Sequence, residues 1–156
     1  MPVQQLEQFL DNRGVKYVSI KHSLAYTAQE VAASAHVSGR EMVKTLAVKL
    51  DGKLALVALP ASEKMDLRQL QDTTGAANVE LATEAEFGSR FPGCEVGAMP
   101  PFGNLFGMDT YVTESLTRDR EIAFNAGTHT EVIRMSYDDF ERLAEPKKVG
   151  AAARSG

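Results

Sequence analysis

The sequence predicts a single α+β domain built around a mixed β-sheet, and three observations lead to that prediction. The chain has 156 residues, which is the length of one domain with one hydrophobic core. Its 44% hydrophobic and 24% charged residues are typical of a globular protein and exclude a disordered or collagen-like chain. Helical and alternating segments follow one another without the regular rhythm of a doubly wound fold. We expect residues 1–146 to form the domain and residues 147–156 to be a frayed tail.

The first forty residues predict helix, strand and helix. Apolar residues at helical spacing occupy residues 3–13, and Gly14 stands where a glycine ends a helix. Residues 15–20 alternate and are rich in β-branched and aromatic side chains, which favours a strand. A capping box that begins at Thr27 then predicts a short helix over residues 27–35.

A β-hairpin and two helices follow. Residues 42–50 and 53–59 are apolar runs separated by Asp51-Gly52, a strong two-residue turn signal, and Pro60 ends the second strand.

The helices are marked by their ends. Residues 66–74 form a helical pattern that Gly75 terminates, and a second capping box at Thr83 and Glu86 begins a brief helix that ends near Arg90.

The last third of the domain contains three predicted strands and a helix. The strands cover residues 109–112, 121–125 and 130–135, and Ser136 caps a final helix with Asp139 at its third position. Together these elements favour a mixed sheet or barrel.

Between the two halves lies a segment of different composition, residues 91–107, which is rich in glycine and proline and almost uncharged. A long loop in a compact domain usually binds something. Its backbone N–H groups could hold a carbonyl oxygen or a developing oxyanion; alternatively, the segment is a surface turn stiffened by proline.

Charge and residue types exclude several classes of function. The net charge of −4 argues against wrapping of duplex DNA but leaves room for a local basic patch that binds a short stretch of RNA. The single cysteine, Cys94, excludes an internal disulfide and a cysteine-based zinc site, and the histidines lack metal-ligand spacing, so we expect no metal and no cofactor. The candidates for the basic patch are Arg40, Lys44, Lys49, Lys53, Lys64 and Arg68.

Neither a membrane span nor a signal peptide is predicted. The longest uncharged run, residues 96–108, contains two prolines and three glycines and is too short to cross a bilayer. We therefore expect a cytoplasmic protein without a membrane partner.

Two side chains stand out as chemical candidates. Lys44 lies in a strand whose other residues look buried, so it either occupies a polar cavity or reaches solvent from the strand end. Cys94 could be a reactive thiol, but nothing near it in sequence would lower its pKa, which favours a buried structural residue.

Two motifs together resemble the YbaK/ProX family of aminoacyl-tRNA editing domains, which occur alone or inserted in bacterial prolyl-tRNA synthetases. The motifs are Val-Lys-Thr-Leu at residues 43–46 and Gly-Ala-Met-Pro-Pro-Phe-Gly at residues 97–103. The resemblance covers about residues 6–143 and includes His22-Ser23 and the Ala-Gly-Thr-His segment at residues 126–129.

The resemblance implies an α+β domain with a strongly curved, barrel-like sheet surrounded by helices. The implied activity is hydrolysis of the ester that joins a wrong amino acid to tRNA, commonly alanine or cysteine on tRNA(Pro), with prolyl-tRNA synthetase as a second candidate partner. In the family a lysine at the position of Lys44 is most closely tied to deacylation, and the loop from Gly97 to Pro101 holds the aminoacyl carbonyl. The residues expected to contact the substrate are His22, Thr45, Ser62, Ala98, Met99 and His129.

This chemistry agrees with what the residues offer. An aminoacyl ester is already activated, so a preorganised carbonyl site with a positioned water or ribose hydroxyl suffices without a metal or a protein nucleophile. Two rival hypotheses remain: a non-catalytic module that binds an aminoacyl group or a synthetase, and an esterase for small molecules. Met99-Pro100 and Thr45 differ from other family members, so the sequence leaves the preferred amino acid open. The Ser62 hydroxyl either faces the pocket or caps a turn.

Overall fold

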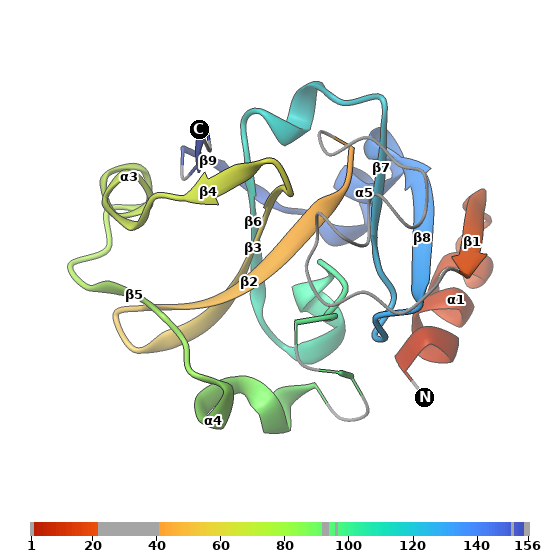
Figure 1. The fold of residues 1–156 in the computed structure, drawn as a ribbon, viewed down its shortest axis with the longest axis horizontal. Coiled ribbons are helices and arrows are strands. Elements are labelled where there is room, and N and C mark those ends of the chain that lie inside the picture. The colour runs from red at the N-terminus through yellow and green to blue at the C-terminus, as the bar shows by residue number, and fades with distance from the viewer. Residues whose placement is uncertain (1, 22–40, 92–93, 96, 151, 155–156) are drawn as a thin grey trace.

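The computed structural model describes residues 2–21, 41–91, 94–95, 97–150 and 152–154, and the strands of this part form three sheets with helices around them (Figure 1). The largest sheet has the order β5 (Val79–Leu81), β2 (Val43–Leu50), β3 (Lys53–Pro60), β6 (Asp109–Thr113), β9 (Lys147–Val149). The second has the order β1 (Tyr17–Lys21), β8 (Glu131–Ser136), β7 (Glu121–Asn125), and the third pairs β10 (Ala152–Arg154) with β4 (Glu63–Met65). The helices are α1 (Pro2–Asn12), α3 (Leu67–Thr74), α4 (Glu84–Phe87) and α5 (Tyr137–Ala144), with 3-10 turns η1 (Gly88–Arg90), η2 (Gly103–Phe106) and η3 (Leu116–Arg118).

The largest sheet is mixed, as the sequence predicts. Strands β2 and β3 form the expected antiparallel hairpin, and Asp51 and Gly52 at its turn have φ angles of 52° and 82°, the left-handed conformation that a tight hairpin requires. Strand β6 then pairs with β3, and β9 with β6, in parallel. The mixed α+β architecture is therefore confirmed, whereas closure of the sheets into a barrel stays a prediction.

The helix ends follow the sequence signals. The Asp66 carboxylate accepts a hydrogen bond from the Gln69 N–H at 3.1 Å, and Gly75 ends α3 with φ of 77°. The capping box at Thr83 begins α4, and the Ser136 hydroxyl accepts from the backbone of α5.

The two larger sheets meet at one point. Met42 forms a parallel bridge with Ala123, and the Ala123 N–H donates to the Glu41 carbonyl at 2.9 Å. From this contact β2 and β7 run apart (Figure 1). The residues that follow Met42 lie in β2 and those that follow Ala123 lie in β7, two strands that are adjacent at this bridge and then diverge.

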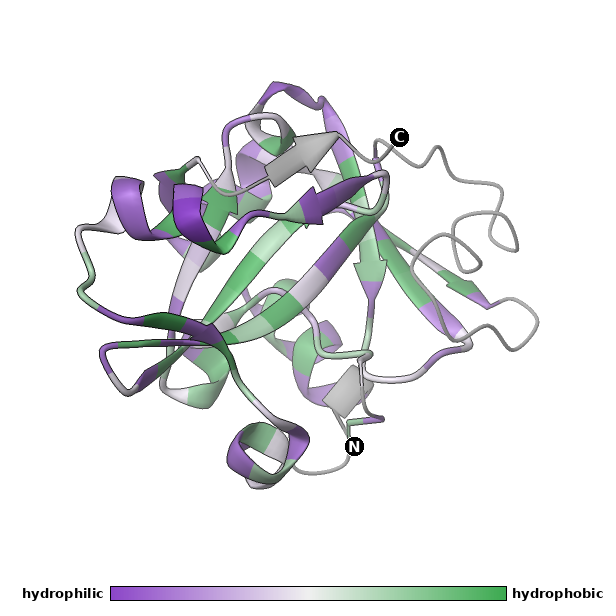
Figure 2. Cartoon of the chain, turned by 60° about the vertical axis from the view of Figure 1, so that its left-hand side comes forward, coloured by the Kyte–Doolittle hydropathy of each residue, from purple (hydrophilic) through white to green (hydrophobic). Residues whose placement is uncertain are grey.

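Hydrophobic residues fill the space between α1, α5 and the sheets. The ring of Phe102 is fully buried and contacts those of Phe9, Phe124 and Phe140, with centroids 5.9, 5.6 and 5.4 Å apart. The long central strands are largely hydrophobic, and the outlying helices and turns are hydrophilic (Figure 2). Because Phe102 directly follows the Gly97–Pro101 loop, the core fixes one end of that loop.

Two expectations need comment. Within the expected tail, residues 147–149 and 152–154 are paired as strands: β9 pairs with β6, and β10 pairs with β4. The sequence did not predict these strands, because short segments such as Lys147–Val149 carry no pattern of their own and are ordered by the neighbouring strand. The helix expected over residues 27–35 lies outside the described residues.

Candidate functional site

The Gly97–Pro101 loop is held against the turn between β7 and β8. The Glu95 N–H donates to the Gly127 carbonyl at 2.8 Å, and the Gly127 N–H donates to the Ala98 carbonyl at 2.9 Å. The Glu95 carboxylate accepts from the His129 N–H at 2.8 Å. These three bonds hold residues 95–98 against residues 127–129, and together the two segments form one wall of the candidate site.

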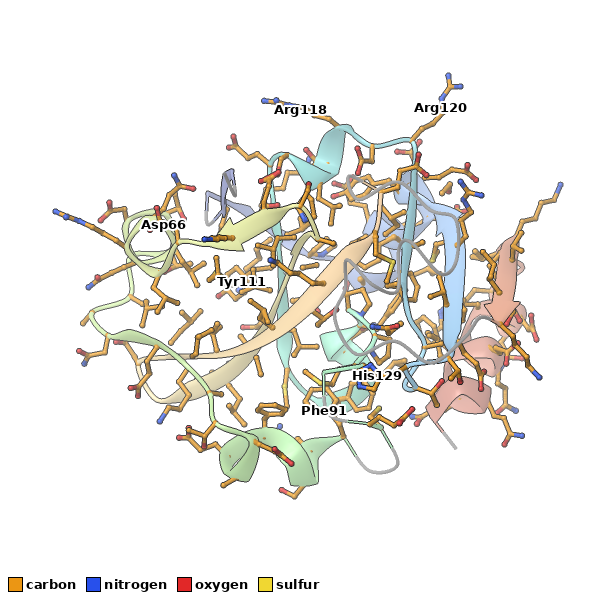
Figure 3. The ribbon with its side chains drawn as sticks, in the orientation of Figure 1. Asp66, Phe91, Tyr111, Arg118, Arg120 and His129 are labelled. Atoms are coloured by element: carbon orange, nitrogen blue, oxygen red, sulfur yellow. The ribbon has the colours of Figure 1, made fainter. Side chains whose placement is uncertain are left out.

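His129 closes the end of this wall. A Cβ built on Gly97 would lie 3.7 Å from the His129 Cε1, so the imidazole stands directly against the glycine. Gly97 has a φ of 81°, which is why a glycine is required at the turn. His129 itself is buried (Figure 3).

The backbone donors of the described residues in this stretch show what the wall can do chemically. The N–H groups of Glu95 and Ala98 bond to backbone carbonyls, and the two prolines have none. That leaves Gly97 and Met99, whose N–H groups form no hydrogen bond with any residue in the described part of the chain. Two uncommitted N–H donors on a rigid loop are suited to bind a carbonyl oxygen or an oxyanion.

Lys44 lies near the start of β2, opposite Leu59. Its side chain is partly buried and forms no ion pair with a residue that the structure describes. Burial lowers the pKa of the Lys44 ammonium, Glu63 offsets part of that shift, and Lys64 adds to it. A half-buried ammonium is available to bind an anionic or polar group.

Of the remaining predicted residues, the structure brings some to the loop and separates others. Thr45 is buried on the face of β2 opposite Lys44. Ala47 lies on the same face as Thr45 and packs in one cluster with Met99. Ser62 is partly buried just after β3, and His22 lies outside the described residues. Gly97, Ala98, Met99 and His129 lie together, whereas Thr45 and Lys44 point away from each other.

Sequence reasoning missed Glu95, whose carboxylate holds the backbone of His129. No local pattern could have found it, because the two residues are far apart in the chain and only the fold joins them.

The Cys94 thiol and possible metal ligands are the other chemical groups that the sequence raised. Burial raises the pKa of the Cys94 thiol to about 11, so the thiolate is scarce at neutral pH. No group of histidine, cysteine and carboxylate side chains suited to hold a metal ion occurs among the described residues.

The expected basic patch is only partly available. Lys49 binds both Glu80 and Glu86, and Lys53 lies 3.7 Å from Asp109. Arg118 and Arg120 are instead exposed, without an ion pair to the residues described, and project from one edge of the molecule (Figure 3). Lys64 and Arg68 are also exposed.

Comparison with known proteins identifies the family. A family model described as the aminoacyl-tRNA editing domain matches residues 22–143, and the chain belongs to this family. No helix among the described residues is long and apolar enough to cross a membrane.

Two curated relatives match almost the whole chain. One is the "Multifunctional Ser/Thr-tRNA deacylase ProXp-y" of Escherichia coli K12, which is 29% identical over 94% of this chain and 90% of its own length. Another is the "Prolyl-tRNA editing protein ProX" of Acetoanaerobium sticklandii, which is 25% identical over 87% of this chain and 86% of its own.

A solved structure described as a candidate trans-editing enzyme for prolyl-tRNA synthetase shares the fold, with a TM-score of 0.81 and 22% identity over 99% of this chain and 98% of that one.

Proposed function

We propose that this protein is a trans-editing deacylase that hydrolyses the ester between a mischarged amino acid and the 3′ end of tRNA. One observation supports this most directly: the Gly97 and Met99 N–H groups are unbonded within the described chain, on a loop that three hydrogen bonds hold to the β7–β8 turn. Such donors stabilise the charge that an ester carbonyl develops during hydrolysis.

The reaction needs only water as a second reactant. Water adds to the ester carbonyl carbon, and the N–H groups of Gly97 and Met99 hold the oxygen that becomes negative. The bond from that carbon to the ribose oxygen then breaks, and the ribose oxygen takes up the proton that the attacking water gives up. The products are the free amino acid and a tRNA with a free terminal hydroxyl.

Lys44 contributes positive charge in this scheme. Its partly buried ammonium holds the terminal phosphate or ribose, or balances charge near the carbonyl. The half-buried position strengthens such an interaction, since solvent screens it less than on an open surface.

The substrate is a tRNA that carries a small wrong amino acid. We infer alanine or cysteine on tRNA(Pro) from the family resemblance, and the name of the E. coli relative adds serine and threonine to the panel to be tested. One methylene changes pocket affinity by only about 1–3 kcal/mol, so such a site acts best as a second sieve that excludes the larger, correct amino acid.

We further infer that Arg118 and Arg120 contact the phosphate backbone of the acceptor stem. They precede β7 and the loop with His129 follows it, so the length of this strand, about 13–17 Å at the usual rise of about 3.3 Å per residue, lies between them. Contacts from arginines to phosphates would position the tRNA so that its single-stranded 3′ end extends toward the loop.

The test is deacylation of labelled alanyl-, cysteinyl-, seryl-, threonyl- and prolyl-tRNA(Pro) by the wild type, Lys44→Ala and, as a control, the exposed Lys16→Ala. We expect rapid loss of at least one mischarged species, with prolyl-tRNA(Pro) spared, and loss of this activity in Lys44→Ala alone. No turnover above the spontaneous rate would contradict the proposal for these substrates. Retained binding without turnover would then favour a non-catalytic module, and hydrolysis of simple amino-acid esters without competition by tRNA would favour a small-molecule esterase.

A further inference from the structure

Asn125, the last residue of β7, carries an unusual buried polar group. The residue is 7% exposed, and its Oδ1 has no hydrogen-bond partner among the residues that the structure describes. A buried acceptor without a donor destabilises a fold, so an arrangement of this kind needs a reason.

The register of the strands places Asn125 on the same face as Lys44. Met42 and Ala123 are bridge partners in a parallel arrangement, so their side chains lie on one face. Because side chains alternate, the residues two positions further on, Lys44 in β2 and Asn125 in β7, return to that face. They flank the region where the two strands diverge.

Asn125 also leads directly into the carbonyl-binding wall. The next residues, from Ala126 to His129, form the turn that accepts from Glu95 and donates to Ala98. A group bound at the Gly97 and Met99 N–H donors thus lies at the end of β7 where the Asn125 amide is found. Rotation about the Asn125 Cβ–Cγ bond exchanges the positions of its oxygen and nitrogen, so the oxygen can occupy either of two positions at the end of β7.

We propose that the Asn125 side-chain oxygen accepts a hydrogen bond from the α-amino group of the aminoacyl substrate. The inference rests on the proposed function. The α-amino group is a donor that every aminoacyl ester carries next to its carbonyl, and it remains a donor whether protonated or neutral. A neutral amide oxygen suits both forms, and binding of the substrate supplies a donor that Oδ1 lacks among the described residues.

The experiment compares the free and N-acetylated forms of the mischarged tRNA that the wild type hydrolyses fastest. The variants are Asn125→Leu, which keeps the shape but removes the acceptor, and Asn125→Asp, which keeps an acceptor. We expect Asn125→Leu to lower kcat/KM for the free-amino substrate about tenfold or more. For the N-acetylated substrate, wild type and Asn125→Leu should hydrolyse equally slowly, and Asn125→Asp should keep most of the activity on the free form.

Thermal unfolding separates this role from a structural one. If the oxygen is reserved for the substrate, Asn125→Leu has a Tm equal to or above that of the wild type, because it removes an unpaired buried acceptor. A lower Tm with parallel losses on both substrate forms would overturn the inference. So would unchanged kinetics, or a loss confined to seryl and threonyl substrates, which would assign the amide to a side-chain hydroxyl.

Binding keeps the inference testable if the proposed function fails. A tRNA whose alanine is joined to the terminal ribose by a non-hydrolysable amide can be titrated onto each variant, with its α-amino group free or acetylated. Absence of hydrolysis by the wild type would contradict the deacylase activity alone. Binding of the free-amino analogue that is about tenfold weaker for Asn125→Leu, with the acetylated analogue unaffected, would still support the amino-group contact. Equal binding by both proteins would refute it.

Discussion

Replacement of Gly97 by alanine tests the carbonyl site most sharply. The added Cβ meets only the His129 Cε1 at 3.7 Å, which is an ordinary van der Waals contact, so no steric clash arises. The destabilisation comes from the backbone. Its φ of 81° lies in the left-handed region, where an alanine costs about 1–2 kcal/mol of folding free energy relative to glycine. For a domain of this size, about 1–2 kcal/mol corresponds to a fall in Tm of about 2–8 °C.

The effect on deacylation should be much larger than the effect on stability. Relief of the strain turns the peptide groups at Gly97 and thereby misaligns a donor that must meet the oxyanion. Removal of one such donor typically costs about 10²–10³ in rate, so we expect kcat/KM to fall about a hundredfold.

The assay is deacylation of the preferred mischarged tRNA, with Tm measured by calorimetry on the same samples. Gly88→Ala is the matched control, since its Cβ lies 4.0 Å from the nearest atom and its backbone is right-handed, with φ of −55°. It should change neither quantity appreciably. If Gly97→Ala shows the lower Tm but the kcat/KM of the wild type, the reasoning that the loop N–H groups hold the carbonyl is refuted.

Three further predictions concern charged side chains. Because burial lowers the pKa of Lys44, deacylation that requires its ammonium should decline at a pH below the ordinary lysine pKa of 10.5. Lys44→Arg should shift this decline to higher pH, and an identical pH profile for both proteins would contradict a role of the Lys44 charge. The hydrogen bond from Lys49 lowers the pKa of Glu86 to about 2. The stability that Glu86 contributes is therefore complete above its ordinary pKa of 4.5 and is lost as the pH falls through about 2. The Tm difference between the wild type and Glu86→Gln should shrink over that range. The double variant Arg118→Glu/Arg120→Glu should raise KM for aminoacyl-tRNA and make KM less dependent on salt, while kcat stays constant. Lys16→Glu, just before β1, is the control, and an equal rise of KM in the double variant and the control would indicate a non-specific charge effect.

Local signals in the sequence determined most of the individual elements. The Asp51-Gly52 pair fixed the hairpin, and the caps at Asp66, Thr83 and Ser136 fixed where helices begin, because each of these signals acts between residues close together in the chain. The short strands β9 and β10 escaped prediction, since three residues carry no periodicity and become strands only beside a partner.

The candidate site divides in the same way. The sequence alone indicated Lys44 and the Gly97–Pro101 loop as the residues of interest, through an unusual lysine in an apolar strand and an unusual density of glycine and proline. It could not show that Glu95 and Gly127 hold the loop, nor that the Gly97 and Met99 N–H groups form no hydrogen bond within the described part of the chain. Hydrogen bonds between distant segments depend on strand register, which no single segment specifies.

Only the tertiary structure made Asn125 a candidate for this chemistry. In the sequence it is one polar residue at the end of a β-pattern, and nothing distinguishes it from a surface asparagine. The bridge between Met42 and Ala123 sets the two strands in parallel and thereby puts Asn125 on the face of Lys44. Burial is a property of the assembled fold. The Asn125 amide is a candidate for substrate binding because its oxygen is buried and no donor reaches it from the described residues.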